Sequence, residues 1–290
     1  MWQTLALLAV VAGAVATQPS LGVRAEIVSR ASNPGEALRL DIATTGAPST
    51  VAIRGFDRVA PAVPLGEGRF FGLLGIDLDV PPGPHPITVT ARAGQDAHVY
   101  ELIVEVEEKS FPTRQLRVAP RFVNPPPAAG RRIARERAAL GKLFRTLTPK
   151  PLWHGPFRRP IESTVISGFG VRSVFNGQPR APHGGADFAS PSGTPVGAPG
   201  GGRVLLAAPL YFTGQTVVVD HGLGLISLFA HLSRIDVDVG DEVDAGEQLG
   251  LVGATGRVTG PHLHWTVRLN GARVDPLSVI GVLGDHQSPN

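Results

Sequence analysis

The chain has 290 residues, of which 42% are hydrophobic and 18% charged, and its formal net charge is +3. This is the composition of an ordinary globular protein, long enough for one large or two medium domains. The 36 Gly and 27 Pro favour short strands and many turns, and the absence of Cys excludes disulfides and thiolate metal sites. Any metal must therefore be bound through His, Asp or Glu.

Residues 1–16 are predicted to be a secretory signal peptide. An apolar run from Leu5 to Ala16 ends in an A-x-A cleavage pattern and is shorter than the about 20 apolar residues that span a bilayer. No Lys or Arg precedes the run, so an uncleaved anchor or a buried first strand is the alternative. A signal peptide implies an exported protein, located in the periplasm, elsewhere in the cell envelope or outside the cell.

Residues 24–108 show the period-two alternation of strands with one buried face. Leu38, Leu40 and Ile42 alternate with polar residues, and Pro- and Gly-rich turn signals separate such runs. Short strands at this spacing predict an immunoglobulin-like β-sandwich. No cluster of candidate catalytic residues falls in this range.

Residues 109–159 form a basic connector, with 13 Lys and Arg against one acid, Glu136. An extended, Pro-punctuated part is followed by a helix predicted over about residues 128–147, with its apolar residues near one stripe. The connector either contacts an anionic wall or membrane surface or joins two acidic domains. A nucleic-acid partner is not expected for an exported chain.

Residues 160–280 are again rich in short β-runs separated by Gly-rich turns, as in residues 216–219 and 225–229. They predict a second β domain, followed by a short tail over residues 281–290. The whole chain is therefore expected to be mainly β, with one helix in the connector.

Two motifs of the second domain carry candidate metal ligands. His262 and His264 are two residues apart in a predicted strand and so share one face. Upstream, His183 and Asp187 are four residues apart in a segment whose glycines disfavour a helix, so they also share a face. One histidine of the pair would complete a His₂Asp set with an open fourth position, the pattern of a catalytic zinc.

A zinc hydrolase also needs a proton acceptor beside the activated water, and an imidazole has a suitable pKa. The candidates are the second histidine of the H-x-H pair and His231, which follows an apolar run. A buried, hydrogen-bonded core histidine is the alternative interpretation of His231. His221 lies at a turn and is expected to be structural.

The motifs HGGAD, FAHLS and GPHLHW, in this order and spacing, resemble the three signatures of the lysostaphin-type (LytM-like) zinc endopeptidases that cut peptidoglycan peptides. The resemblance covers roughly residues 160–280. It implies a mostly antiparallel β domain with a groove across its sheet for an extended peptide of peptidoglycan. Residues 24–108 would then be a spacer, a wall-contacting module or a regulator.

The resemblance also implies residue roles. His183, Asp187 and His264 would bind one Zn²⁺. His231 and His262 would act beside the activated water and the scissile carbonyl, one as base and the other as oxyanion stabiliser, in an order that the motifs leave open.

Two positions bear on whether the chain is an active or a latent member of the family. Phe229 stands where many family members have Tyr, and Asn176 could keep the enzyme latent by occupying the open metal position, although an Asn-Gly pair is also a common turn. The alternative function is a catalytically silent or latent relative that binds cell wall and regulates other wall hydrolases. The intact histidines and Asp187 argue against it. The motifs specify neither the cleaved bond, D-Ala to diaminopimelate or glycyl, nor the oligomeric state.

Overall fold

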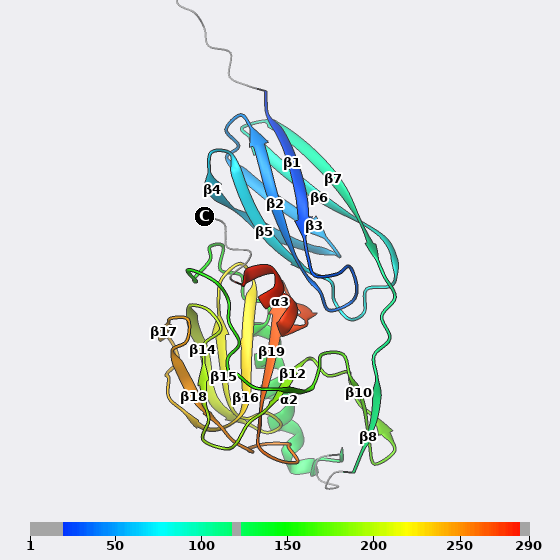
Figure 1. Cartoon of the computed structure of the whole chain (residues 1–290), viewed down its shortest axis with the longest axis vertical. Coiled ribbons are helices and arrows are strands. Elements are labelled where there is room, and N and C mark those ends of the chain that lie inside the picture. The colour runs from blue at the N-terminus through cyan, green and yellow to red at the C-terminus, as the bar shows by residue number, and fades with distance from the viewer. Residues whose placement is uncertain (1–19, 118–122, 285–290) are drawn as a thin grey trace, which may run out of the picture.

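The computed structural model describes residues 20–117 and 123–284 as two stacked β domains (Figure 1). The signal peptide predicted for residues 1–16 lies outside the described residues. Across the described ranges, no helix has the length and apolar character needed to cross a membrane.

The N-terminal domain is one antiparallel sheet with the strand order β1-β2-β5-β4-β3-β6-β7. Its strands are β1 (Gly22–Val28), β2 (Ala37–Thr45), β3 (Thr50–Gly55), β4 (Arg58–Gly66), β5 (Arg69–Gly75), β6 (Gly83–Ala93) and β7 (Asp96–Val106). The first and last strands of this order contact one another, so the sheet is nearly closed around its core. Leu38, Leu40 and Ile42 all point into that core, as their alternation predicts.

The pairing differs from the two separate sheets of the predicted sandwich. β4 pairs with β3 through residues 58–61 and with β5 through residues 62–66, with a register shift between Pro64 and Gly66. One strand therefore belongs to both halves and makes the sheet continuous. The prediction of an all-β domain is confirmed, and its architecture is a near-closed seven-stranded sheet.

The C-terminal domain is built on a second, antiparallel sheet, as the sequence predicts. Its main path is β17 (Glu242–Val243), β14 (Gly202–Leu210), β15 (Gly214–Asp220), β16 (Leu225–Ile235), β19 (His262–Leu269), β12 (Gly185–Ala189) and β9 (Val165–Ser167). Beside this path lie β13 (Pro195–Gly197), β18 (Gln248–Val252) and β20 (Ala272–Val274). Phe188, Phe229 and Trp265 are the largest fully buried side chains of its core.

The basic connector is part of the fold around this sheet. Its strand β8 (Thr113–Leu116) pairs in parallel with β10 (Arg172–Phe175), which also pairs with β11 (Gln178–Pro179). The 3₁₀ turn η1 (Pro127–Ala129) leads into α2 (Gly130–Leu143), which lies inside the range predicted for a helix. Leu140, Leu143 and Phe144 pack on apolar side chains of β15 and β16. The connector therefore contributes both a strand and a helix to the C-terminal half.

The two domains share a buried core. Ala37 and Leu73 of the N-terminal sheet pack among core residues of the C-terminal domain. At the junction lies α3 (Pro276–Leu283), which runs into the range predicted as a tail (Figure 1). The Ser278 hydroxyl accepts a hydrogen bond from the backbone N–H of Ala37 at 2.7 Å and donates to the buried Glu36 carboxylate at 2.8 Å. These contacts hold the N-terminal domain against the site-bearing domain.

Candidate metal centre and active site

Neighbouring strands bring the candidate ligands together. β12 and β19 pair antiparallel with Asp187 directly opposite His264, and residues opposite one another in such a pair project from the same face. His262 lies two residues before His264 on β19 and shares that face. On the other side of β19, Ala230 of β16 is opposite His264, which brings His231 next to the pair.

His231 reaches the site through an unusual backbone conformation. Its φ of +67° lies in the left-handed region that residues other than glycine seldom adopt. The register of β16 against β15 shifts across this position, its register against β18 shifts just after it, and the His231 N–H donates to the Thr213 carbonyl at 2.8 Å. A bulge of this kind re-aims a side chain. As a result His231, at the end of an apolar run, lines the same groove as the four other candidate residues, His183, Asp187, His262 and His264.

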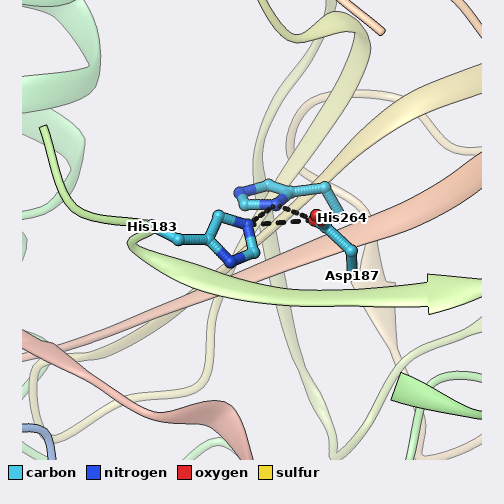
Figure 2. A group of neighbouring side chains, drawn as sticks. All are labelled: His183, Asp187 and His264. Atoms are coloured by element: carbon cyan, nitrogen blue, oxygen red, sulfur yellow. Dashed lines mark hydrogen bonds and ion pairs between the residues drawn. The ribbon is translucent and has the colours of Figure 1, made fainter. Parts of the chain in front are cut away.

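His183, Asp187 and His264 direct one donor atom each to a common point (Figure 2). His183 Nε2 and His264 Nδ1 are 3.0 Å apart, and they lie 3.0 and 2.7 Å from Asp187 Oδ1. A four-coordinate zinc with bonds of about 2.0–2.1 Å holds its ligand atoms about 3.4 Å apart. A small outward movement of these three atoms would admit such an ion.

In His183 and His264, the hydrogen bond made by the ring nitrogen that points away from the common point determines whether the facing nitrogen has a lone pair. Nδ1 of His183 donates to the Gly168 carbonyl at 2.9 Å, so Nε2 of the neutral ring carries a lone pair. Nε2 of His264 is 2.8 Å from the Thr266 hydroxyl, which can accept its proton and leave a lone pair on Nδ1. Two imidazole lone pairs and a carboxylate then face one another, an arrangement that a cation satisfies. The donor group therefore fits a bound metal ion.

The electrostatics of the group favour its metal-binding protonation states. Burial acts to raise the pKa of Asp187, but the hydrogen bonds and positive charge that His183 and His264 offer in their protonated forms outweigh it and hold that pKa well below its usual range. Burial lowers the pKa of His264 in spite of the hydrogen bond with Asp187. Metals bind an ionised carboxylate and a neutral imidazole, which are the states that these shifts favour at Asp187 and His264.

Two further imidazoles face the same groove. Nδ1 of His231 donates to the Thr255 carbonyl and Nδ1 of His262 to the Gly260 carbonyl, both at 2.9 Å, so each neutral ring has an unprotonated Nε2. Their ring centroids are 4.9 Å apart. Burial and the neighbouring His264 lower the pKa of His231 to about 3. These rings can accept a proton at a site beside the metal-binding group.

Comparison with known proteins agrees with this geometry. Residues 181–276 match the family model described as Peptidase family M23. A crystal structure of an M23 peptidase from Pseudomonas aeruginosa is 34% identical, with a TM-score of 0.68, and the match covers 88% of this chain and 97% of that one. The chain belongs to peptidase family M23. The resemblance indicated by the three motifs is thereby confirmed.

Two curated relatives of this M23 peptidase have named activities. Peptidoglycan DD-endopeptidase ShyA of Vibrio cholerae is 41% identical over 123 residues, which are 41% of this chain and 29% of that protein. DD-carboxypeptidase/endopeptidase Mpg of Neisseria meningitidis is 44% identical over 97 residues, 33% of this chain and 22% of that protein. The matched part is thus less than a third of each relative's length.

Asn176 occupies a turn of the M23 peptidase. Its φ of 51° and that of 82° at Gly177 are typical of the two-residue hairpin turn that joins β10 to β11. The Asn176 N–H donates to the Leu116 carbonyl at 3.0 Å. Asn176 is not among the residues that line the groove, so the geometry supports the turn interpretation over latency.

Phe229, which stands where many family members have Tyr, is not among the residues that line the groove. Phe229 is opposite Trp265 in the β16–β19 pair, and the two rings stack in the core with centroids 6.4 Å apart. Since side chains alternate along a strand, this face of β19 is the one that His264 does not use. A tyrosine hydroxyl at this position would point into the core.

The groove has a volume of about 280 Å³ and includes residues that the sequence motifs did not indicate. Arg114 and Leu116 come from β8, Phe175 comes from β10, and Phe212 and Arg257 come from loops. The position of Arg257 just ahead of GPHLHW is a signal that could have identified it. The sequence around β8 does not predict that this strand lines the groove, because its pairing with β10 joins distant parts of the chain.

Proposed function

We propose that this M23 peptidase is a zinc-dependent endopeptidase that hydrolyses the peptide cross-links of bacterial peptidoglycan. The main support is the convergence of three unprotonated donor atoms from His183, Asp187 and His264 in a groove that two further imidazoles face. The named activities of the relatives ShyA and Mpg, both of which act on DD bonds, support the same substrate class.

His183, Asp187 and His264 are the residues proposed to hold the metal. Two imidazole nitrogens and a carboxylate, with no thiolate in the chain, form a donor set that suits zinc. A bound zinc ion would supply Lewis-acid chemistry, lowering the pKa of a water molecule and polarising the scissile carbonyl.

His231 and His262 are proposed to carry the proton transfers. The unprotonated Nε2 of one ring takes the proton released as water attacks, and the same ring returns it to the departing amine. The other ring stabilises the charge that develops on the carbonyl oxygen, by a hydrogen bond that it makes when protonated.

The remaining assignments belong to the same proposal. Export to the periplasm or cell envelope is supported by the A-x-A pattern of residues 14–16. An immunoglobulin-like classification of residues 24–108 is supported by the strand orders β1-β2-β5-β4 and β3-β6-β7, which correspond to the two sheets of that fold and are joined here through β4. Contact of the connector with an anionic wall or membrane is supported by α2, in which no residue is buried and whose basic side chains largely face outward.

The test is digestion of purified peptidoglycan by the mature full chain, first with zinc and then after chelation, with products identified by mass spectrometry. We expect chelator-sensitive release of cross-link fragments, and the fragments would name the bond. The Asp187→Asn variant provides the matched inactive control. Zinc-loaded protein that releases no fragments would contradict the proposal and favour the regulatory alternative.

A further inference from the structure

Glu136 of α2 is the only acid of the basic connector, and its side chain is partly enclosed. That side chain is 18% exposed, against 48% for Arg132 one helical turn before it. Oε1 of Glu136 accepts a hydrogen bond from Arg132 Nε at 2.6 Å, and Oε2 accepts one from the backbone N–H of Tyr211 at 2.8 Å. The first bond is an ordinary pair within a helix, but the second joins α2 to a segment 75 residues further along the chain.

This segment is the turn of residues 211–213, which joins β14 to β15. The same helix binds the chain just ahead of the turn, because Nη2 of Arg132 donates to the Pro209 carbonyl at 3.2 Å. The other two residues of the turn, Phe212 and Thr213, line the groove that contains the four histidines. The connector helix therefore anchors a turn that forms part of the candidate active site.

The 211–213 turn is also in close contact with residues 255–256. Gly214, directly after the turn, has a φ of +63°, and Gly256 has a φ of +77°. A Cβ on Gly214 would clash with Thr255, and a Cβ on Gly256 would clash with the Phe212 carbonyl oxygen. Only glycine combines these backbone angles with such close approach, so the two segments are packed directly against each other. The turn is thus held by residues 255–256 as well as by α2.

His231 takes its hydrogen bonds from the same two segments. Its backbone N–H donates to the Thr213 carbonyl of the turn at 2.8 Å, and its Nδ1 donates to the Thr255 carbonyl at 2.9 Å. The backbone of His231, with a φ of +67°, is strained, and a conformation of this kind persists only where the surrounding structure holds it. The position of the turn therefore helps to set the direction of the imidazole.

We propose that Glu136 is a positioning residue for His231 and acts through the 211–213 turn. This inference rests on the proposed function of His231 and adds a residue of the connector to the groups that support it. Two hydrogen bonds form the path, from the Tyr211 N–H to Glu136 and from the His231 N–H to Thr213. Without the first bond the turn is held less firmly, the second bond opens more often, and the strained backbone of His231 relaxes.

The first measurement is hydrogen exchange of the His231 amide by NMR, in the full chain with zinc and again after its removal. Glu136→Ala removes both hydrogen bonds of the carboxylate and leaves a good helix former in α2. We expect the His231 amide to exchange at least about 10-fold faster than in the wild type, and the Val218 amide of β15 to exchange at an unchanged rate. Glu136→Gln keeps an acceptor oxygen for the Tyr211 N–H and should keep the exchange rate of His231 close to that of the wild type.

The second measurement is kcat and KM for a soluble cross-linked peptide, with one zinc bound per chain. Glu136→Ala should lower kcat by about 10- to 100-fold and change KM little, because a displaced catalytic group slows the reaction while the contacts that bind the substrate remain. Glu136→Gln should retain most of kcat. The control is Glu242→Ala, which removes an exposed glutamate paired with Arg203 at the opposite end of β14 and should leave both exchange and kcat unchanged.

Hydrogen exchange separates this inference from the proposed function. Faster exchange confined to the His231 region in Glu136→Ala, and absent from Glu136→Gln, supports the inference even if no peptide is cleaved, an outcome that would contradict only the proposed function. Wild-type exchange of the His231 amide in Glu136→Ala would overturn the inference while cleavage itself stands. Faster exchange throughout β15 and β16 would also overturn it, as a general loss of stability, and so would an unchanged kcat in an active enzyme whose His231 amide exchanges faster.

Discussion

Asp187 and His264 are directly opposite one another in the β12–β19 pair, with Asp187 Oδ1 2.7 Å from His264 Nδ1. The backbone register of two adjacent strands therefore sets the distance between these candidate metal donors. A substitution that keeps the shape of either side chain should leave this register intact. Changes in metal affinity can then be separated from changes in folding.

The Asp187→Asn variant is expected to fold normally and to lose zinc affinity. The carboxamide keeps the size of the carboxylate but removes its charge. Removing a residue that only hydrogen-bonds to a metal ligand typically lowers metal affinity by about 10- to 100-fold, and the loss of zinc affinity in Asp187→Asn should be larger. Zinc per chain after dialysis against buffered zinc measures the change. Added zinc should raise the Tm of the wild type but not of the variant. Glu242→Gln, whose side chain is 76% exposed, is the matched control, and zinc binding by Asp187→Asn at wild-type affinity would contradict the ligand assignment.

His231→Gln and His262→Gln are expected to keep the zinc and lose activity. Their Nε2 atoms face the groove without belonging to the three-residue donor group, so kcat should fall by about 100- to 10,000-fold, as for loss of a general acid–base residue. Zinc content and kcat are measured on the same samples. Loss of the metal from either variant would instead make that histidine a ligand. His98→Gln, an exposed histidine of β7, serves as the control.

The sequence predicted the relationships that depend on local geometry. The common face of His262 and His264 follows from the two-residue period of a strand, and both side chains line the groove. The alternation at Leu38, Leu40 and Ile42 likewise identified a buried face. The residues that share one face of a strand can be predicted from this periodicity without knowing which element the strand packs against.

Features made by distant parts of the chain were not predicted. Arg114 reaches the groove because β8 pairs with β10, and nothing near Arg114 in sequence indicates that partner. The continuous N-terminal sheet depends on β4 pairing on both of its sides, and the core shared by Ala37 with the C-terminal domain depends on docking. Strand order and domain docking are set by tertiary packing, which single-strand patterns do not encode.

His221 is expected to make folding stability depend on pH. It is fully buried, its Nδ1 donates to the Gly201 carbonyl at 2.8 Å, and its Nε2 lies 2.9 Å from the Ser227 hydroxyl. Burial lowers its pKa from 6.5 to about 4, so the folded state holds a neutral ring. Its contribution to stability is complete above pH 6.5 and decreases as the pH falls from 6.5 towards 4, because the unfolded chain takes up the proton first.

The size of the effect is about 2 kcal/mol of unfolding free energy at pH 5. Chemical denaturation of the wild type and His221→Asn from pH 7.5 to 4.5 measures it, with the metal removed from both proteins. The variant should be less stable at neutral pH but should lose less stability on acidification. His98→Asn should keep the wild-type pH dependence. Parallel curves for the wild type and His221→Asn would show that His221 does not titrate on unfolding.

The final prediction concerns the junction of the two domains. Ser278→Ala removes the acceptor of the Ala37 N–H and the donor to the buried Glu36 carboxylate. Leaving buried polar groups without these bonds should lower the unfolding free energy by about 1–3 kcal/mol. Because the N-terminal Ala37 and Leu73 belong to the core of the C-terminal domain, both domains should unfold in one transition, at a lower denaturant midpoint in the variant.

Ser49→Ala removes an exposed hydroxyl that donates to the Arg92 carbonyl and should change stability by no more than about 0.5 kcal/mol. Intrinsic fluorescence and far-ultraviolet circular dichroism follow the transitions of the wild type and both variants. Two separate transitions in the wild type would show that the domains unfold independently. In that case the shared core would contribute little, and a chain lacking residues 20–108 would keep the stability of its C-terminal domain. A single transition instead means that the N-terminal domain supports the sheet that carries His264, and its deletion should lower the Tm of the remaining chain.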